Sequence, residues 1–214
     1  MRYYKFLTRG GAGPFSGKHW TTDWLHEPDI VPCERGLHAC RVTDLPYWLH
    51  EELWQVELDG PVTVIGRKVL APRGRLSVRV DAWDAGAAES FARSCIGRVA
   101  SHAAYECSEL DDGSLRDVAQ HLTDPQSSTW VTADVRELAL NRQEAAARAG
   151  RLIAARVCGL LVDAVDMAGE YPVAALGYVA ARAAQTRPPS AEGDRYDAER
   201  RWQAAWLSER LELS

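Results

Sequence analysis

The 214-residue sequence has no long hydrophobic run and no apolar stretch near its start. A membrane-spanning helix needs roughly 20 consecutive apolar residues, and a signal peptide needs an apolar core of about 7–15 residues. The opening segment, MRYYKFLTRGG, has neither. With 46% hydrophobic and 26% charged residues, the composition is that of an ordinary globular protein with a sizeable core. We therefore expect a cytoplasmic protein that does not enter a membrane.

Cysteine occurs in an odd number, at positions 33, 40, 95, 107 and 158. Without a secretory signal these thiols are expected to stay reduced, which argues against a disulfide framework. The zinc-binding patterns C-x2-C and H-E-x-x-H are absent. Cys95 and Cys158 lie among apolar residues at helical spacing, so they are predicted to be small core residues.

Lysine is scarce, with three residues against 22 arginines, and we ascribe this ratio to a biased genome more than to function. Residues 1–80 carry eleven Lys and Arg against nine Asp and Glu, a net charge of +2, and the remainder carries 14 against 21, a net charge of −7. The basic residues of the first part concentrate in GRKVLAPRGRLSVRV, residues 66–80. Nucleic-acid affinity grows with the number of phosphates neutralised, so this chain is a poor candidate for binding nucleic acid, although the basic segment can hold a local anion.

Alternation of apolar and polar residues predicts a β-rich region over residues 1–82. Strands are expected at 1–7, at 37–41 and in LWQVELDG (53–60), and VTVIGRKVL and RLSVRVDAW are expected to form a hairpin that turns at APRG. Leu76 and Val78 are predicted to face inward from the second strand of this hairpin. The glycine-rich segment TRGGAGPFSGKHWTTDW (8–24) is predicted to be a long exposed loop.

From Trp83 onward the apolar spacing is helical. Asp84 is predicted to cap a helix that carries Phe91, Cys95 and Val99 on one stripe. A second helix is expected within residues 142–165, with a buried face that is formed by Ile153, Val157, Leu160, Leu161 and Val165.

The fold class predicted from these patterns is α+β, with an N-terminal antiparallel β-rich region and a mostly helical C-terminal half. The expected divisions are a β-rich region 1–82 that carries the site, a helical region 83–185, a linker 186–195 and a C-terminal amphipathic helix 196–214.

The segment PCERGLHACRV, residues 32–42, is chemically the densest part of the chain. Four hypotheses fit it: a zinc site built from Cys33, His38 and Cys40, a cysteine nucleophile activated by His38, a purely structural strand, or a strand that faces a ligand. His38 and Cys40 share one face of the predicted strand. No metal is included in the predicted site, because a fourth ligand would have to come from elsewhere in the chain.

Four stretches resemble a known group of domains: YKFL (4–7), PFSGKHW (14–20), CERGLHACRVTDLPYWL (33–49) and LWQVELDG (53–60). They are similar to an uncharacterised group of bacterial and phage domains with a C-x-x-G-[LF]-H-x-C signature. More remotely, their order over about the first 65 residues resembles the ADP-ribosyltransferase fold, in which an opening strand precedes a glycine-rich loop, a strand, a short helix and a further strand.

The resemblance implies ligand-contacting positions. His38 stands where that family has a tyrosine against the nicotinamide, and Tyr47 or Trp48 stands near the second stacking aromatic residue. Tyr4 and Lys5 occupy the first-strand position that holds the adenosine ribose. The sequence departs from the family in lacking the opening histidine-glycine or arginine and an identifiable late catalytic glutamate, so the fold analogy does not by itself imply the transferase activity.

The leading hypothesis is a small-molecule enzyme or ligand-binding protein whose pocket lies between the loop 10–24 and the strand–helix unit 36–48. Its ligand would be anionic or nucleotide-like, held by flat aromatic surfaces and by bidentate arginines. His38, a general acid or base near neutral pH, and Glu57 are the candidate catalytic residues. The candidate ligand-binding residues are Tyr4, Lys5, His19, Trp20, Arg41, Tyr47, Trp48, Arg67 and Arg73. The sequence does not identify a cofactor.

The alternative hypothesis is a non-catalytic subunit of a homo- or hetero-oligomeric complex, either biosynthetic or phage-related. In YDAERRWQAAWLSERLEL (196–213), Trp202 and Trp206 are spaced i, i+4 and need a surface on which to pack. They either pack on the body of the chain or dock a protein partner.

Overall fold

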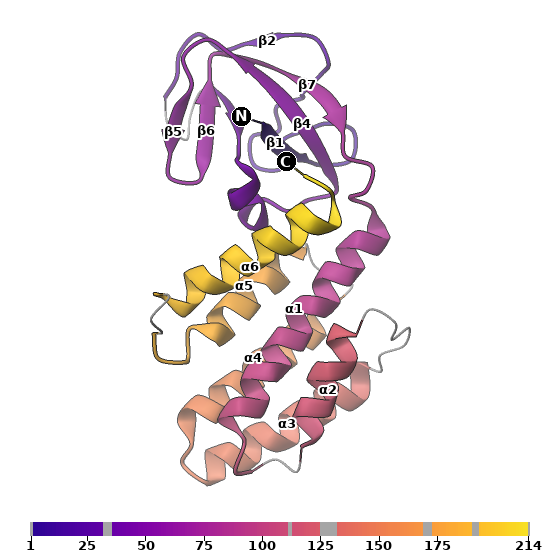
Figure 1. Cartoon of the computed structure of the whole chain (residues 1–214), viewed down its shortest axis with the longest axis vertical. Coiled ribbons are helices and arrows are strands. Elements are labelled where there is room, and N and C mark those ends of the chain that lie inside the picture. Colours follow the sequence, from indigo (N-terminus) through magenta and orange to yellow (C-terminus); the bar gives the residue numbers. More distant parts are fainter. Residues whose placement is uncertain are drawn as a thin grey trace. The chain divides into compact units, whose positions relative to one another are not determined.

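The computed structural model describes residues 2–31, 36–110, 113–124, 132–168, 173–189 and 193–213. The fold class is α+β, as predicted, with antiparallel strands in the N-terminal half and helices in the C-terminal half (Figure 1). The chain forms two compact units, one of residues Met1–Ala88 with Arg201–Ser214 and the other of residues Glu89–Arg200. Within the described ranges, every helix is too short or too polar to traverse a lipid bilayer.

The first unit contains two antiparallel sheets. The four-stranded sheet has the order β1-β4-β7-β2 and the three-stranded sheet has the order β3-β6-β5. A short 3-10 helix, η1 (Val42–Tyr47), follows β3. The strands are β1 (Tyr3–Leu7), β2 (Leu25–His26), β3 (Leu37–Ala39), β4 (Glu52–Asp59), β5 (Thr63–Ile65), β6 (Lys68–Ala71) and β7 (Arg73–Arg79).

An isolated β-bridge links the two sheets. At this bridge Tyr4 of β1 and Cys40, just after β3, exchange both backbone hydrogen bonds, at N···O distances of 2.9 and 2.8 Å. Leu37 and Ala39 of β3 are buried in the core of the unit, and His38 between them is half-buried, as the strand alternation predicts. The other buried members of this core are Leu7, Trp20, Val56 and Leu76.

The predicted hairpin at APRG is wrong, because β6 and β7 pair in different sheets. The segment instead turns between β5 and β6, at Gly66. The φ of Gly66 is 57°, a conformation that suits glycine. Val78, predicted to face inward, is 56% exposed. An extra residue of β7 between the partners of Gln55 and Val56 interrupts the side-chain alternation there.

The helices are α1 (Ala85–Glu106), α2 (Ser114–Thr123), α3 (Thr132–Arg148), α4 (Leu152–Asp166), α5 (Val173–Ala184) and α6 (Arg195–Arg210). The predicted start of α1 is confirmed, because the Asp84 carboxylate accepts the backbone N–H of Ala87 at 2.7 Å. The predicted stripe of Phe91, Cys95 and Val99 is fully buried. Of the predicted linker 186–195, residues 190–192 lie outside the described ranges.

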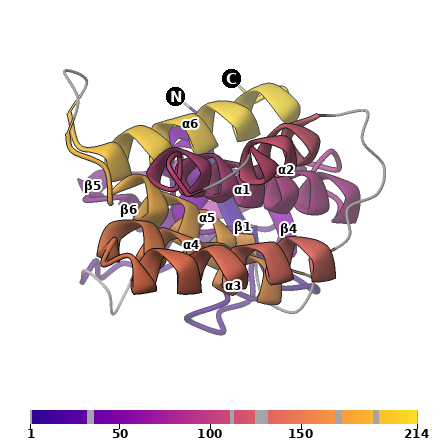
Figure 2. The same ribbon diagram turned by 90° about the horizontal axis from the view of Figure 1, so that it is seen from below.

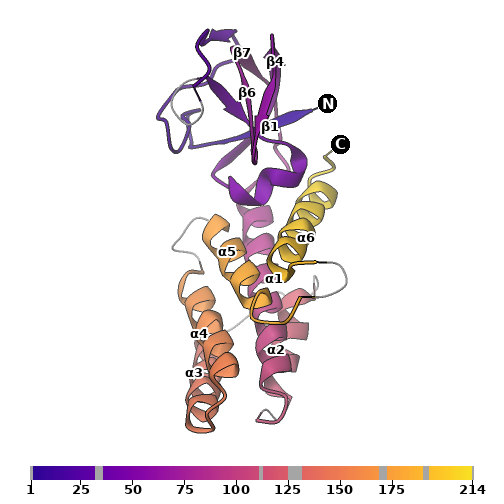
Figure 3. The ribbon, with the colours of Figure 1, turned by 90° about the vertical axis from the view of Figure 1, so that its left-hand side faces the viewer.

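Within the second unit, α3 and α4 lie side by side (Figures 2 and 3). The expected single helix over residues 142–165 is wrong, because the chain turns at Gly150, with a φ of 69°, between α3 and α4. Val157, Leu161 and Val165 of α4 are buried, as predicted, whereas Leu160 is half-buried and Ile153, on the first turn of α4, is 53% exposed. Cys158 is a core residue, as predicted, and its sulfur lies 3.4 Å from that of buried Cys107.

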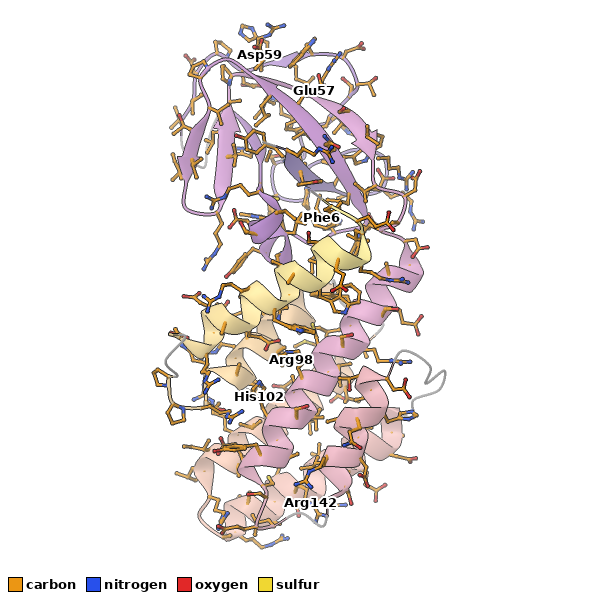
Figure 4. The ribbon with its side chains drawn as sticks, viewed as in Figure 1. Phe6, Glu57, Asp59, Arg98, His102 and Arg142 are labelled. Carbon is orange, nitrogen blue, oxygen red and sulfur yellow. The ribbon has the colours of Figure 1, made fainter. Side chains whose placement is uncertain are left out.

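A buried ion pair joins α1 to α6 in this unit. Arg98, labelled on α1 in Figure 4, donates its Nε–H to both carboxylate oxygens of Glu199, at 2.6 and 2.7 Å. The Glu199 side chain is almost completely buried. Removing Arg98 alone would leave the buried Glu199 carboxylate without this partner, which is destabilising.

The packing of α1 on α2 yields a test of this unit. A Cβ atom added at Gly97 would lie 2.8 Å from Cγ2 of Thr123 and 3.1 Å from Cβ of Leu122. The Gly97→Ala substitution is therefore expected to lower the free energy of unfolding by about 1–3 kcal/mol, measured by urea denaturation, although alanine is the better helix former.

Gly86→Ala, on the same helix, is the matched control. Its Cβ would meet nothing closer than 3.4 Å, so it should leave the free energy of unfolding unchanged or raise it by up to about 1 kcal/mol. Equal effects of the two substitutions would contradict the close approach of α1 and α2.

Candidate functional site

A cavity of about 440 Å³ lies in the first unit. Its volume falls within the range of small-molecule sites, about 300–1,000 Å³. Its walls come from β1, the loop 13–20, β3 with its continuation to Cys40, Trp48 directly after η1, and the start of β6. The predicted site residues that line it are Tyr4, Lys5, Trp20, His38 and Trp48.

The glycine-rich loop forms one wall of this cavity. It folds back on itself through a bridge between Ala12 and His19, and the N–H of Trp20 donates to the carbonyl of Gly11 at 2.9 Å. This turn buries Trp20 and leaves the His19 side chain exposed, away from the cavity. Phe15, at the tip of this loop, is 83% exposed. Its ring packs edge to face on the Trp48 ring, with 6.2 Å between the two ring centres.

All three lysines of the chain line the cavity, and they come from three separate segments. Lys5 lies on β1, Lys18 on the loop and Lys68 at the start of β6. Among the residues that the structure describes, no arginine lines the cavity, although the sequence contains 22. A biased genome explains why lysine is rare, but it does not explain why the few lysines converge on one place.

Lys5 is held by two neighbours. Its Nζ donates to the carbonyl of His38 at 2.7 Å and lies 4.9 Å from the centre of the Trp20 ring. Both contacts favour the charged ammonium. Burial acts in the opposite direction and is the stronger effect, so that the pKa of Lys5 falls to about 8; the charge of Lys68 lowers it further and Cys40 opposes the shift.

The other two lysines have partners of their own. Lys18 forms an ion pair with Glu27, which also lines the cavity. Lys68 places its Nζ 5.4 Å from the centre of the Trp48 ring. The indole N–H of Trp48 donates to the carbonyl of Arg67 at 3.3 Å, which fixes the orientation of that ring.

His38 meets the charge of all three lysines. Burial, followed by the positive charges of Lys5, Lys68 and Lys18, lowers the pKa of His38. Its Nε2 is buried and has no hydrogen-bond partner within the described part of the chain. The imidazole is therefore neutral near pH 7.

Cys40 is a protonated core thiol. Its Sγ donates to the carbonyl of Tyr4 at 3.4 Å, and burial raises its pKa to about 12. Cys33, the other cysteine of the metal and nucleophile hypotheses, lies outside the described residues. Over the ranges that the structure describes, no three His, Cys, Asp or Glu side chains come close enough to share a metal ion.

The predicted anion-binding arginines are engaged elsewhere. Arg41 donates to the Asp44 carboxylate at 2.6 Å and to the carbonyl of Gly66 at 3.2 Å. Arg67 lies over the Tyr47 ring, 3.8 Å from its centre, and neither residue is part of the cavity wall. Arg73 pairs with Asp59 at 2.6 Å and lies over Trp24.

Glu57, the second candidate catalytic residue, does not line the cavity with His38. Its carboxylate accepts hydrogen bonds from Arg75 at 2.8 Å and from Ser77 at 3.2 Å. Figure 4 shows Glu57 and Asp59 toward one end of β4, well away from Phe6, which lines the cavity. Among the described residues, the glutamate that lines the cavity is Glu27, which sequence reasoning missed together with Phe15, Lys18 and Lys68.

The C-terminal tryptophans are half-buried. On α6 the buried residues at this end are Gln203, Ala204 and Leu207, and Trp202 and Trp206 are only partly covered. Residues 201–214 group with the β-rich unit, so this end of the helix packs within the chain. A protein partner or homo-oligomer at Trp202 and Trp206 stays a prediction.

Comparisons of the chain with protein-family models, curated proteins and solved structures found no match. The bacterial and phage domain family and the ADP-ribosyltransferase resemblance therefore rest on the sequence motifs alone. The geometry of the cavity carries the functional argument.

The environment of Cys40 predicts a lack of thiol reactivity. With a pKa of about 12, roughly one Cys40 in ten thousand is a thiolate at pH 8, and Cys95, Cys107 and Cys158 are also buried. A Cys33→Ser variant should release well under one equivalent of thionitrobenzoate from Ellman's reagent when folded and four equivalents in urea. Rapid modification of Cys40 in the folded variant would restore the nucleophile hypothesis.

Proposed function

We propose that the β-rich unit binds a planar, anionic small molecule in the cavity beside His38. The observation that carries this proposal is the convergence of all three lysines on one cavity with aromatic walls. Positive charge favours an anionic group, and aromatic faces favour a flat ring.

The charge of the cavity supports an anionic ligand. Three lysines line it, whereas Glu27, paired with Lys18, is the one carboxylate on its wall among the described residues. His38 is neutral and does not offset this charge. The net charge of the cavity wall is therefore positive. Because the walls exclude part of the solvent, the attraction between this charge and an anion is stronger than in bulk water.

The aromatic residues support a planar group. Trp20 and Trp48 lie on different segments of the wall, and Phe15 extends from the loop to meet Trp48. Lys5 lies beside one indole and Lys68 beside the other. A ring with a phosphate or carboxylate substituent therefore finds a stacking surface and a cation next to each other.

The ADP-ribosyltransferase resemblance supports a nucleotide as the planar anion. Of the residues that it aligns with ligand contacts, Tyr4, Lys5, His38 and Trp48 line the cavity, and Tyr47 does not. Transfer of ADP-ribose needs a carboxylate near the reacting sugar. Because Glu57 is paired with Arg75 elsewhere, the proposal is limited to ligand binding.

Calorimetric titration with AMP, ADP-ribose and NAD⁺, and fluorescence titration with anilinonaphthalene sulfonate, test this proposal. At least one of these planar anions should bind with a dissociation constant below about 1 mM. Lys68→Met and Trp48→Leu should each weaken that binding about tenfold, because each removes an interaction of about 1 kcal/mol or more.

Arg73→Met is the matched control, because it removes a cation of the same unit that lies outside the cavity. This variant should bind the same probe with the affinity of the unmodified protein. The proposal fails if none of the four probes binds, or if Arg73→Met weakens binding as much as Lys68→Met.

A further inference from the structure

We propose that the side-chain amine of Lys5 is a nucleophile that forms an imine with an aldehyde or ketone group of the ligand in this cavity. The inference rests on the proposed function, because it assumes that a planar anion occupies the cavity. It adds a covalent step to binding and names the ligand class, an anionic carbonyl compound.

The choice of lysine over arginine is the first argument. In this chain arginine forms ion pairs outside the cavity, including those with Asp44, Asp59 and Glu57. Arginine is also the better residue for holding a phosphate or carboxylate, because its guanidinium binds two oxygens at once. A lysine can lose its proton at accessible pH, whereas an arginine cannot. Because the chain is rich in arginine and its lysines all line one cavity, we infer that the cavity uses the chemistry of a neutral amine.

The position of Lys5 is the second argument. It lies on β1, a strand that is fixed by pairing with β4 on one side and by the Tyr4–Cys40 bridge on the other. Its Nζ is held at one point, by the carbonyl of His38, beside the Trp20 ring. A nucleophile on a rigid strand keeps its geometry when the ligand enters.

The protonation of Lys5 agrees with this role. With a pKa of about 8, roughly a quarter of the Lys5 side chains are neutral amines at pH 7.5. An ordinary lysine is neutral in about one molecule in a thousand at that pH. Desolvation next to a second cation, here Lys68, is a known way to activate a lysine toward carbonyl compounds.

The other cavity residues complete the arrangement. Lys18, paired with Glu27, and Lys68, beside Trp48, supply the charge that holds the anionic group. His38 lines the same cavity and has a buried nitrogen without a hydrogen-bond partner among the described residues. It is the group available to carry a proton between the amine and the carbonyl oxygen.

The step balances without an oxidant or reductant. The lone pair of the neutral Lys5 nitrogen attacks the carbonyl carbon, the N–C bond forms as the C=O π bond breaks, and the first proton of the nitrogen passes to the carbonyl oxygen to give a carbinolamine. The second proton of the nitrogen passes to the hydroxyl, the C–O bond breaks, water leaves, and a C=N bond remains. Addition of water reverses the reaction and returns the ligand.

Borohydride trapping with pyridoxal phosphate as the probe tests the inference, because this compound combines a planar ring, a phosphate and an aldehyde. After equilibration and reduction, peptide mapping should place one adduct per chain at Lys5, at least tenfold above Lys18 and Lys68. The yield should rise with pH around a midpoint near 8. This measurement uses the unmodified protein, so it does not depend on how a variant folds.

Three controls separate the covalent step from binding. Pyridoxine phosphate, which has no aldehyde, should bind with similar initial affinity and leave no adduct after borohydride. Lys5→Arg, with its fold verified by circular dichroism, should lose the pyridoxal phosphate adduct. Lys68→Met should need more pyridoxal phosphate for half-saturation and should still be modified at Lys5.

Each contrary outcome has its own meaning. Binding of pyridoxine phosphate together with no adduct at Lys5, or with adducts spread evenly over the three lysines, overturns the imine and leaves the proposed binding function standing. Failure of pyridoxine phosphate and of the nucleotide probes to bind overturns both.

Discussion

The backbone bridge between Tyr4 and Cys40 is the constraint on which the site depends. Each of the two sheets contributes one participant to it, and the bridge is isolated, so the pairing does not continue along the strands. Tyr4 and Cys40, the two residues of the bridge, both line the cavity. The carbonyl of His38, two residues before Cys40, accepts the Lys5 ammonium, so that both side chains belong to the same wall.

The cavity wall contains polar groups that an optimally stable core would not contain. The buried Nε2 of His38 has no partner among the described residues, and the Lys5 amine lies in surroundings that disfavour its charge. Each arrangement costs free energy relative to an apolar residue of similar size. Elsewhere in the same unit, the cations Arg41, Arg73 and Arg75 are paired with carboxylates. Perturbed groups that gather in one cavity are characteristic of functional sites.

Local patterns in the sequence predicted the parts of this structure that depend on neighbouring residues. The α+β class followed from the change of apolar period near Trp83, and the start of α1 followed from Asp84. The alternation in β3 correctly placed His38 on the face opposite Leu37 and Ala39. The cavity was expected between the loop 10–24 and the strand–helix unit 36–48, and residues of both segments line it. These two segments are close in sequence.

Long-range pairing accounts for what sequence patterns missed. The separation of β6 and β7 into different sheets depends on which strands they meet, and APRG has the composition of an ordinary turn. Arg41, Arg67 and Arg73 were expected to hold an anion because a guanidinium can bind two oxygens at once, but each has another partner in the fold. Lys18 and Lys68 are 50 residues apart in the sequence and line the same cavity. The scarcity of lysine was the signal that could have identified them.

The confinement of lysine to one cavity also affects how this protein can be handled and modified. Reagents that couple through side-chain amines, such as succinimidyl dyes, crosslinkers or activated sensor surfaces, have no lysine targets outside the cavity wall. Labelling through those side chains would therefore block the cavity. For the same reason, any enzymatic acetylation of a lysine in this chain would remove positive charge from the cavity itself.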